Sequence, residues 1–338
     1  MGTESPAFKR IVGQKTAVET LTRALASGRI HHAYRFEGPD GVGKELAALA
    51  FAQALVCEST VTRGCGECSA CRRAVTLNSS PPLVPIHPDV VLVGRGVYPK
   101  SILGREETTG ISVEQVRRVI LGRTSMPPHE GRALVIIIRD AHELGISAAN
   151  ALLKTLEEPP KRTHFILLTS QPNLLIDTIR SRSLPLRFRP LNDALVAQIL
   201  VEKGLNPAVA PLAHGSVSLA CDLATAENLK EYDAFADAAL HSLGAKSLAH
   251  ALDAAEDRPN DRDQFLARLD FLGEKLAGLA RAHVGQDIEK AELAASCHAV
   301  VIQTMGRVKA NMQSGLALEW MLAKLRECGE AELASQPS

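Results

Sequence analysis

Residues 38–45 read Gly-Pro-Asp-Gly-Val-Gly-Lys-Glu, between a short apolar run and a helical pattern. In such a loop, glycines let backbone N–H groups wrap around phosphate oxygens, and the lysine meets the terminal phosphates. The order of strand, glycine-rich loop and helix therefore predicts an α/β fold with a phosphate-binding loop. Its expected phosphate-contacting residues are Gly38, Gly41, Gly43 and Lys44.

Two positions around this loop depart from what a nucleotide hydrolase needs. Glu45 stands where the G-x-x-x-x-G-K-[ST] pattern has a hydroxyl that ligates Mg²⁺, and its carboxylate would repel phosphate unless a metal intervenes. A hydrolase also uses a carboxylate pair after a hydrophobic strand, but the apolar run 135–138 is followed by Arg139 and Asp140. These departures predict lost hydrolysis. Nucleotide binding without turnover and no binding at all both remain open.

The pattern of apolar residues divides the chain near Pro190. Before it, short apolar runs alternate with helical patterns, which is typical of an α/β domain with a parallel sheet. After it, strand signals vanish and periodic apolar positions predict helices to the end. The expected strands are 34–37, 90–93, 134–138, 165–169 and 184–188, and the helices expected between them are 17–26, 44–56, 113–121 and 147–158.

Composition limits the class of protein. The 338 residues are 46% hydrophobic, which favours a globular protein of two or three domains. Lys plus Arg and Asp plus Glu balance at 38 each, so any nucleic-acid contact must come from a local patch. The N-terminus lacks the apolar core of a signal peptide, and no long uncharged run suggests a membrane span. We therefore expect a cytoplasmic protein without a membrane partner.

Four cysteines follow the phosphate-loop helix with the spacing C-x7-C-x2-C-x2-C. This spacing predicts a tetrahedral structural Zn²⁺ site with no open position for a substrate. An iron–sulfur cluster is the main rival, although the trailing C-x3-C-P of bacterial ferredoxins is missing, and four unligated thiols are a third reading. Cys221, Cys297 and Cys328 are isolated and are expected to be buried. The expected ligands are Cys57, Cys65, Cys68 and Cys71.

Taken together, these motifs resemble those of bacterial clamp-loader subunits, and among them the delta-prime subunits of DNA polymerase III, which belong to the AAA+ superfamily. The stretch 150–160 is the most specific of them, and the resemblance is dense over residues 10–190. The segments that carry it are His-His-Ala-Tyr-Arg-Phe at 31–36, the phosphate loop, the four cysteines, His-Pro-Asp at 87–89, Ile-Ser-Val-Glu-Gln-Val-Arg at 111–117 and Asn-Ala-Leu-Leu-Lys-Thr-Leu-Glu-Glu-Pro-Pro at 150–160.

The resemblance implies an architecture and a set of partners. It implies a P-loop AAA+ domain over 1–189 with a zinc insertion at 57–71, a helical lid domain over 190–228 and an all-α collar domain over 229–338. Five subunits, including tau/gamma and delta, would form an open ring that loads the sliding clamp on primed DNA. As a delta-prime-like member, this chain would be a stator within a DNA-directed DNA polymerase holoenzyme, with no ATP hydrolysis of its own.

The resemblance also implies a role for one arginine. In this family a Ser-Arg-Cys motif places an arginine finger in the neighbour's ATP site, and here the motif is Ser181-Arg182-Ser183, after a helix expected at 174–179. Such a guanidinium offsets charge developing on the transferred phosphoryl group. Arg182 is therefore the candidate finger, its alternative being an ordinary solvated arginine. Active relatives also carry a nucleotide-sensing Arg in a Gly-Ser-x-Arg segment, which is Gly-Ser-Val-Ser at 215–218 here.

Two further hypotheses remain beside the stator. The first is an active tau/gamma-like ATPase, in which Glu45 would bind Mg²⁺ and Asp140 would activate water. The second makes the cysteine module a zinc-dependent DNA-binding element. The insertion 63–73 has no aromatic residues for base stacking, which disfavours this second hypothesis.

Overall fold

The computed structural model describes residues 5–59, 63–104, 110–130, 132–244 and 262–335. The chain forms two compact units. The first comprises Met1–Leu195 with Gly215–Ser218, and the second comprises Val196–His214 with Leu219–Ser338. The division expected at 189/190 and 228/229 into three domains stays a prediction.

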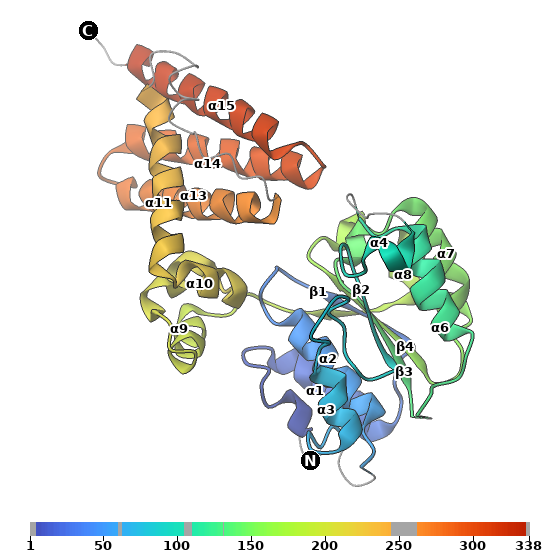
Figure 1. The fold of residues 1–338 in the computed structure, drawn as a ribbon. Coiled ribbons are helices and arrows are strands. Elements are labelled where there is room, and N and C mark those ends of the chain that lie inside the picture. The colour runs from blue at the N-terminus through green and yellow to red at the C-terminus, as the bar shows by residue number, and fades with distance from the viewer. Residues whose placement is uncertain (1–4, 60–62, 105–109, 131, 245–261, 336–338) are drawn as a thin grey trace. The chain divides into compact units, whose positions relative to one another are not determined.

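The first unit is built on a five-stranded sheet with the order β2-β3-β4-β1-β5, in which every pairing is parallel (Figure 1). Each expected strand is present, and the α/β class with a parallel sheet is confirmed. The sheet places β1 between β4 and β5, so the loop after β1 leaves from its interior. The strands are β1 Ala33–Glu37, β2 Val90–Val93, β3 Leu134–Ile138, β4 Thr163–Thr169 and β5 Leu184–Arg187.

Helices cover both faces of this sheet, with α1, α2 and α3 on one side and α7 and α8 on the other (Figure 1). Side chains alternate between the faces along each strand. On β1, Tyr34 therefore packs edge-to-face on Phe51 of α2, with 5.3 Å between ring centroids, while Ala33 joins the core under α7. The helices are α1 Lys15–Ser27, α2 Lys44–Val56, α3 Ser69–Val75, α4 Lys100–Leu103, α5 Val113–Gln115, α6 Gly122–Thr124, α7 Ile146–Glu157 and α8 Asp177–Arg182.

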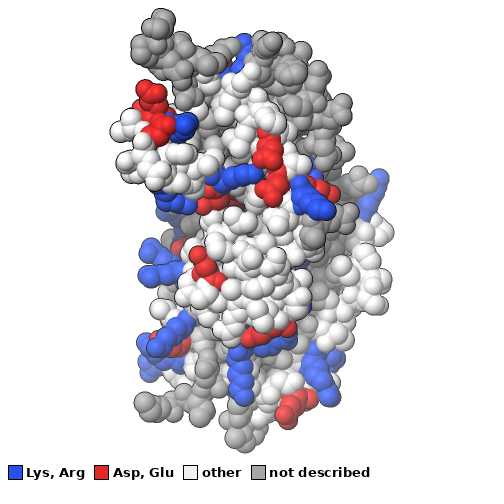
Figure 2. Space-filling view, turned by 90° about the vertical axis from the view of Figure 1, so that its left-hand side faces the viewer, with Lys and Arg blue, Asp and Glu red and all other residues white. Residues whose placement is uncertain are grey.

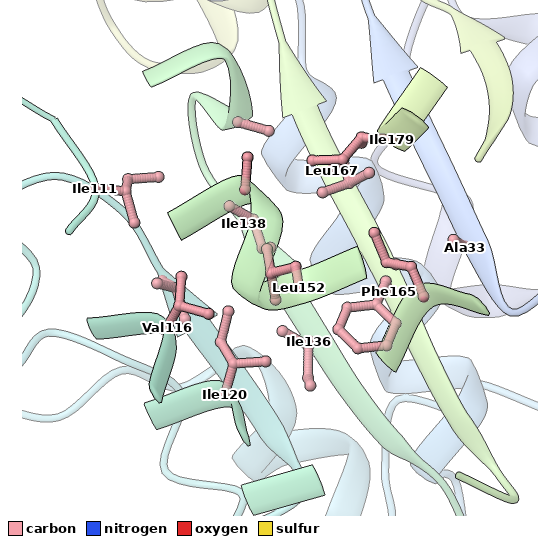
Figure 3. Close-up of a cluster of buried hydrophobic side chains, with 14 of the residues drawn as sticks. Ala33, Ile111, Val116, Ile120, Ile136, Ile138, Leu152, Phe165, Leu167 and Ile179 are labelled. Carbon is pink, nitrogen blue, oxygen red and sulfur yellow. The ribbon is translucent and has the colours of Figure 1, made fainter. Parts of the chain in front are cut away.

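The core on the α7 side is a continuous apolar cluster. Figure 3 shows Leu152 of α7 among the strand residues Ile136 and Ile138, with Ile179 of α8 beside Leu167. All five side chains are fully buried. Burial of each such side chain contributes about 1.5–3 kcal/mol, so α7 and α8 are fixed firmly against the sheet.

Two expected helices differ in detail. The helix expected at 113–121 begins as α5 and continues as a π-helical segment, Val116–Leu121. The helix expected at 174–179 is wrong in its bounds, because a 3-10 turn at Pro172–Leu174 is followed by α8, which starts at Asp177. Leu175 and Ile176 separate the two, because their ψ values of 137° and 143° are extended and interrupt the helical backbone. Ser181 and Arg182 therefore lie inside a helix and not after it.

The second unit is helical throughout its described part, as expected. Helix α13 packs on α14, and α14 packs on α15. None of the described helices is long and apolar enough to cross a membrane. Figure 2 shows one face of the molecule, on which basic side chains are interspersed with acidic ones, in keeping with the balanced charge. The helices that follow the sheet are α9 Asp193–Glu202, α10 Val217–Leu223, α11 Ala226–His241, α13 Arg262–His283, α14 Ile288–Lys309 and α15 Ser314–Ser335.

Candidate functional site

The phosphate loop lies where β1 ends and α2 begins, at the carboxyl edge of the sheet, where open α/β folds bind ligands. The Gly38 N–H donates to the Thr169 carbonyl oxygen at 3.1 Å, which ties the loop to the end of β4. Gly41 and Gly43 have φ values of 74° and 95°, a left-handed conformation that favours glycine. The structure thus has the local backbone geometry expected from the glycine spacing.

The side chain of Lys44 folds back onto the phosphate loop. Its ammonium Nζ donates to the carbonyl oxygens of Gly38 at 2.7 Å and Pro39 at 2.6 Å, and lies 3.1 Å from Asp40 Oδ1. The residue is only 7% exposed. All three donors of the ammonium group are therefore satisfied by the loop itself, and binding a phosphate through Lys44 would require at least one of these bonds to be exchanged.

The two altered positions, Glu45 and Arg139, bind each other. Arg139 Nε donates to Glu45 Oε2 at 2.6 Å, and Arg139 Nη2 pairs with Glu45 Oε1, which makes a bidentate ion pair between the start of α2 and the end of β3. Both side chains are about one third exposed. Planar, bidentate pairs of this kind are the strongest form of arginine–carboxylate contact. The residues at both Mg²⁺-handling positions are thus engaged with one another.

A short segment of the first unit, Gly215–Ser218, lies against the loop. The Val217 N–H donates to the Gly41 carbonyl oxygen at 2.9 Å. The approach is close, because a Cβ added to Gly41 would lie 2.0 Å from Ser216 Oγ and 2.3 Å from Ser218 Oγ. The segment therefore presents serine side chains to the loop.

Asp140 and Thr169 complete the surroundings of the loop. Asp140 has a left-handed backbone, with φ of 42°, and its side chain does not cap the 3-10 turn that follows. Loss of solvation, reinforced by the charge of Asp40, raises the pKa of Asp140 above its usual range. Thr169 Oγ1 lies 3.2 Å from His142 Nδ1 and accepts from the Gln171 N–H. Thr169 therefore has local partners that suit an ordinary strand end.

Arg182, the candidate finger, is the last residue of α8 and is partly exposed. Its Nη2 lies 2.6 Å from Glu157 Oε1 at the end of α7, and its Nη1 donates to the Thr178 carbonyl oxygen at 3.0 Å. About a third of the Arg182 side chain and nearly half of the Glu157 side chain are exposed. Exposed ion pairs of this kind contribute at most about 1 kcal/mol, so the guanidinium can exchange Glu157 for another anion at little cost.

The four expected metal ligands come together. Their sulfur atoms all lie within 4.8 Å of one another, with 3.7 Å between Cys57 and Cys65 and 3.9 Å between Cys65 and Cys71. Four thiolates arranged tetrahedrally around zinc at Zn–S distances of about 2.3 Å would be separated by about 3.8 Å. The donor set and its spacing therefore fit a zinc ion.

Backbone amides support the cluster. The N–H groups of Cys65, Cys68 and Cys71 each donate at 3.4 Å to the sulfur of the preceding cysteine of the set. The amide of Cys68 is the main reason that the pKa of Cys65 is lowered to about 7, whereas burial raises the pKa of Cys71. Of the three remaining cysteines, Cys297 is buried as expected. Cys221 and Cys328 are only half-buried.

Comparison with known proteins assigns a family. Residues 13–192, more than half of the chain, match the sequence model of the family described as DNA polymerase III, delta subunit. The chain belongs to this family. This bears out the resemblance to bacterial clamp-loader subunits.

Individual relatives in the family carry several names. DNA polymerase III subunit tau of Bacillus subtilis is 33% identical over 227 residues, which are 64% of this chain and 37% of tau. Subunit delta' of the same organism is 32% identical over 225 residues, 66% of this chain and 61% of delta'. Subunit tau of Escherichia coli is 36% identical over 186 residues, 55% of this chain and 26% of tau. This chain thus spans less than two thirds of the length of these relatives.

Solved structures are similar as well. A DNA polymerase III gamma subunit-related protein from Thermotoga maritima aligns over 92% of this chain and 99% of its own, with a TM-score of 0.41 and 17% identity.

Two features of the site were not foreseen from the sequence. One is the contact between Glu45 and Arg139, which are 94 residues apart. The other involves Arg35, on the interior strand β1, which bonds to the end of α8 and is only 7% exposed. A signal for the second was present in the sequence, because a single arginine within Ala-Tyr-Arg-Phe is unusual for a strand buried on both faces.

Proposed function

We propose that this chain is the delta-prime-like subunit of a DNA polymerase III clamp loader, a stator that does not hydrolyse ATP. The family match and the relatives named tau, tau/gamma and delta' support a clamp-loader role. In this role the chain assembles with tau/gamma and delta subunits in a hetero-pentamer that places the sliding clamp on primed DNA. Its contribution is to position a neighbour and to complete that neighbour's ATP site.

The ion pair between Glu45 and Arg139 is the observation that carries the non-hydrolysing role. Hydrolysis in this class of fold requires a hydroxyl ligand to Mg²⁺ and an acidic residue for Mg²⁺ and water. At these two positions the chain has a carboxylate and a guanidinium that bind each other at 2.6 Å. Mg²⁺ coordination through Glu45 would have to break the bidentate pair and leave Arg139 uncompensated beside the cation.

The same pair disfavours the alternative of an active tau/gamma-like ATPase, in which Glu45 is itself the Mg²⁺ ligand. Lys44 adds to the argument, since its ammonium is already shared among the loop acceptors. Any ATP or ADP that the loop holds is therefore bound without turnover.

Arg182 is the group that we assign to the neighbour's site, as an arginine finger acting in trans. It lies at the end of a well-anchored helix, and its ion pair is made with the half-exposed Glu157. A guanidinium supplied in trans is worth about 10³–10⁵ in the rate of phosphoryl transfer. The cysteine cluster has a different role, as a structural Zn²⁺ site, since all four coordination positions are filled by thiolates.

The test is ATP hydrolysis by the reconstituted clamp loader with clamp and primed DNA. Arg182→Ala and Lys44→Ala in this chain are compared with the wild type, after gel filtration has established that each variant assembles. We expect Arg182→Ala to lose most of the stimulated turnover and Lys44→Ala to change it little. The reverse pattern would mean that this chain hydrolyses its own nucleotide and that the stator role is wrong.

A further inference from the structure

Arg35 is a buried guanidinium with three hydrogen-bond partners. It lies on β1, where it is paired in register with Leu167 of β4 and Pro185 of β5. Its Nε donates to Glu37 Oε1 at 2.5 Å, which orients the planar group. The Arg35 and Glu37 side chains are 9% and 14% exposed, so this ion pair is largely removed from solvent. A group buried at such cost needs its remaining donors satisfied.

One of the two terminal nitrogens of Arg35, Nη1, is directed at the end of α8. Arg35 Nη1 donates to the Arg180 carbonyl oxygen at 2.9 Å and to Ser183 Oγ at 2.8 Å. The Ser183 hydroxyl in turn donates to the Ile179 carbonyl oxygen at 2.7 Å. The last four carbonyls of a helix have no partner within it. Arg35 and Ser183 thus satisfy two of the four at the end of α8.

These contacts flank the candidate finger. Arg182 lies between Arg180, whose carbonyl accepts from Arg35, and Ser183, whose hydroxyl does the same. Ile179, earlier in the same helix, is fully buried beside Leu167, the register partner of Arg35 on β4 (Figure 3). The backbone around Arg182 is therefore held by the burial of Ile179 and by the hydrogen bonds from Arg35, while the Arg182 side chain pairs with the half-exposed Glu157.

We propose that Arg35, oriented by Glu37 and acting through Ser183, is the positioning residue for the arginine finger. This inference rests on the proposed function, because it needs Arg182 to act in a neighbour's site. It also gives a reason for serine in Ser181-Arg182-Ser183: a hydroxyl accepts a strong hydrogen bond from a guanidinium, whereas a thiol is a weak acceptor. A displacement of about 1 Å in such a group costs about a hundredfold in rate.

The experiment measures ATP turnover of the reconstituted clamp loader carrying Arg35→Gln or Ser183→Ala in this chain. We expect kcat to fall about ten- to a hundredfold for Arg35→Gln and about fivefold for Ser183→Ala, with the KM for ATP unchanged. Ser183→Thr, which keeps the hydroxyl, should retain most of the activity. Arg187→Gln is the matched control, since it removes an exposed guanidinium from the following strand. Ser183→Ala keeps the test valid if Arg35→Gln fails to fold.

The same substitutions are then made in an Arg182→Ala background. Because Arg35 acts through Arg182, neither Arg35→Gln nor Ser183→Ala should lower turnover further there, whereas a general loss of folding or assembly would do so. Wild-type kcat in folded, assembled Arg35→Gln and Ser183→Ala, alongside a strong loss for Arg182→Ala, would overturn this inference alone. Wild-type turnover with Arg182→Ala would overturn the proposed finger and this inference with it.

Discussion

The phosphate loop follows β1, and the end of α8 precedes β5. Each lies beside an arginine side chain, yet the two arginines, Arg139 and Arg182, are paired differently. At the loop, Arg139 closes a bidentate pair with Glu45, and Lys44 is satisfied by its own loop. At the end of α8, the buried Arg35 donates to the Arg180 carbonyl oxygen, and the partly exposed Arg182 makes an ion pair with the half-exposed Glu157. The comparison teaches that the two proposed roles, a loop without ATP hydrolysis and an arginine that acts in a neighbour's site, depend on which charges are already neutralised within the chain.

The largest expected effect concerns the chemistry of Arg182. Arg182→Lys keeps the positive charge but loses the planar fork, which lysine cannot reproduce. We expect stimulated ATP turnover of the reconstituted complex to fall about a hundredfold or more, with assembly unchanged. Steady-state kinetics at saturating ATP measure this effect. Near-normal turnover with Arg182→Lys would show that a positive charge alone is enough at this position. The proposed difference between the end of α8 and the phosphate loop would then lose its support.

The cysteine cluster should matter for stability near the loop. Cys57 follows α2 directly, and Gln53 Nε2 of α2 donates to the Cys71 carbonyl oxygen at 2.9 Å, so the cluster fastens the end of the helix that the loop opens. Cys65→Ser or removal of zinc by a chelator should lower stability by several kcal/mol, part of the about 10–16 kcal/mol typical of structural zinc binding. Thermal unfolding followed by circular dichroism is the measurement.

Metal analysis of the purified chain provides the control for this prediction. We expect one zinc per chain in the wild type and none in Cys65→Ser, while Cys221→Ser, outside the cluster, keeps its zinc. Iron with visible absorbance in place of zinc, or no metal at all under reducing conditions, would contradict the zinc assignment.

A smaller effect is expected where the segment 215–218 meets the loop. Gly41→Ala adds a Cβ that would overlap Ser216 Oγ and Ser218 Oγ, at a residue whose φ is 74°. We expect a loss of about 1–3 kcal/mol in the free energy of unfolding and faster hydrogen exchange at Val217. Gly28→Ala is the matched control, because its φ of 67° is similar and nothing lies within 4 Å of the added atom. Equal losses for both would mean that the close approach contributes nothing.

The smallest effect is the stability contributed by the Glu45 and Arg139 pair. Because both side chains are about one third exposed, a double-mutant cycle of Glu45→Ala and Arg139→Ala should give a coupling of about 0.5–1 kcal/mol. The coupling should weaken as salt is added. Urea unfolding of the four proteins measures it, and zero coupling at low salt would mean that the two positions are independent.

Much of the fold could be predicted from local patterns. Apolar runs located every strand of the sheet, and the C-x2-C-x2-C spacing located the cluster, since both depend on residues close in sequence. The bounds of α8 were missed because Leu175 and Ile176 are extended, which the local apolar pattern does not reveal. The pair of Glu45 with Arg139 could not be predicted, because it depends on how the end of β3 and the start of α2 meet in space.

The central claim is tested most directly by a clamp loader in which only this chain keeps an intact phosphate-loop lysine. Every other ATPase subunit carries the corresponding lysine-to-alanine substitution, and ATP turnover is measured with clamp and primed DNA. The account predicts no turnover above a complex in which Lys44→Ala is also present. Turnover that disappears on adding Lys44→Ala would show that this chain hydrolyses ATP and would contradict the account.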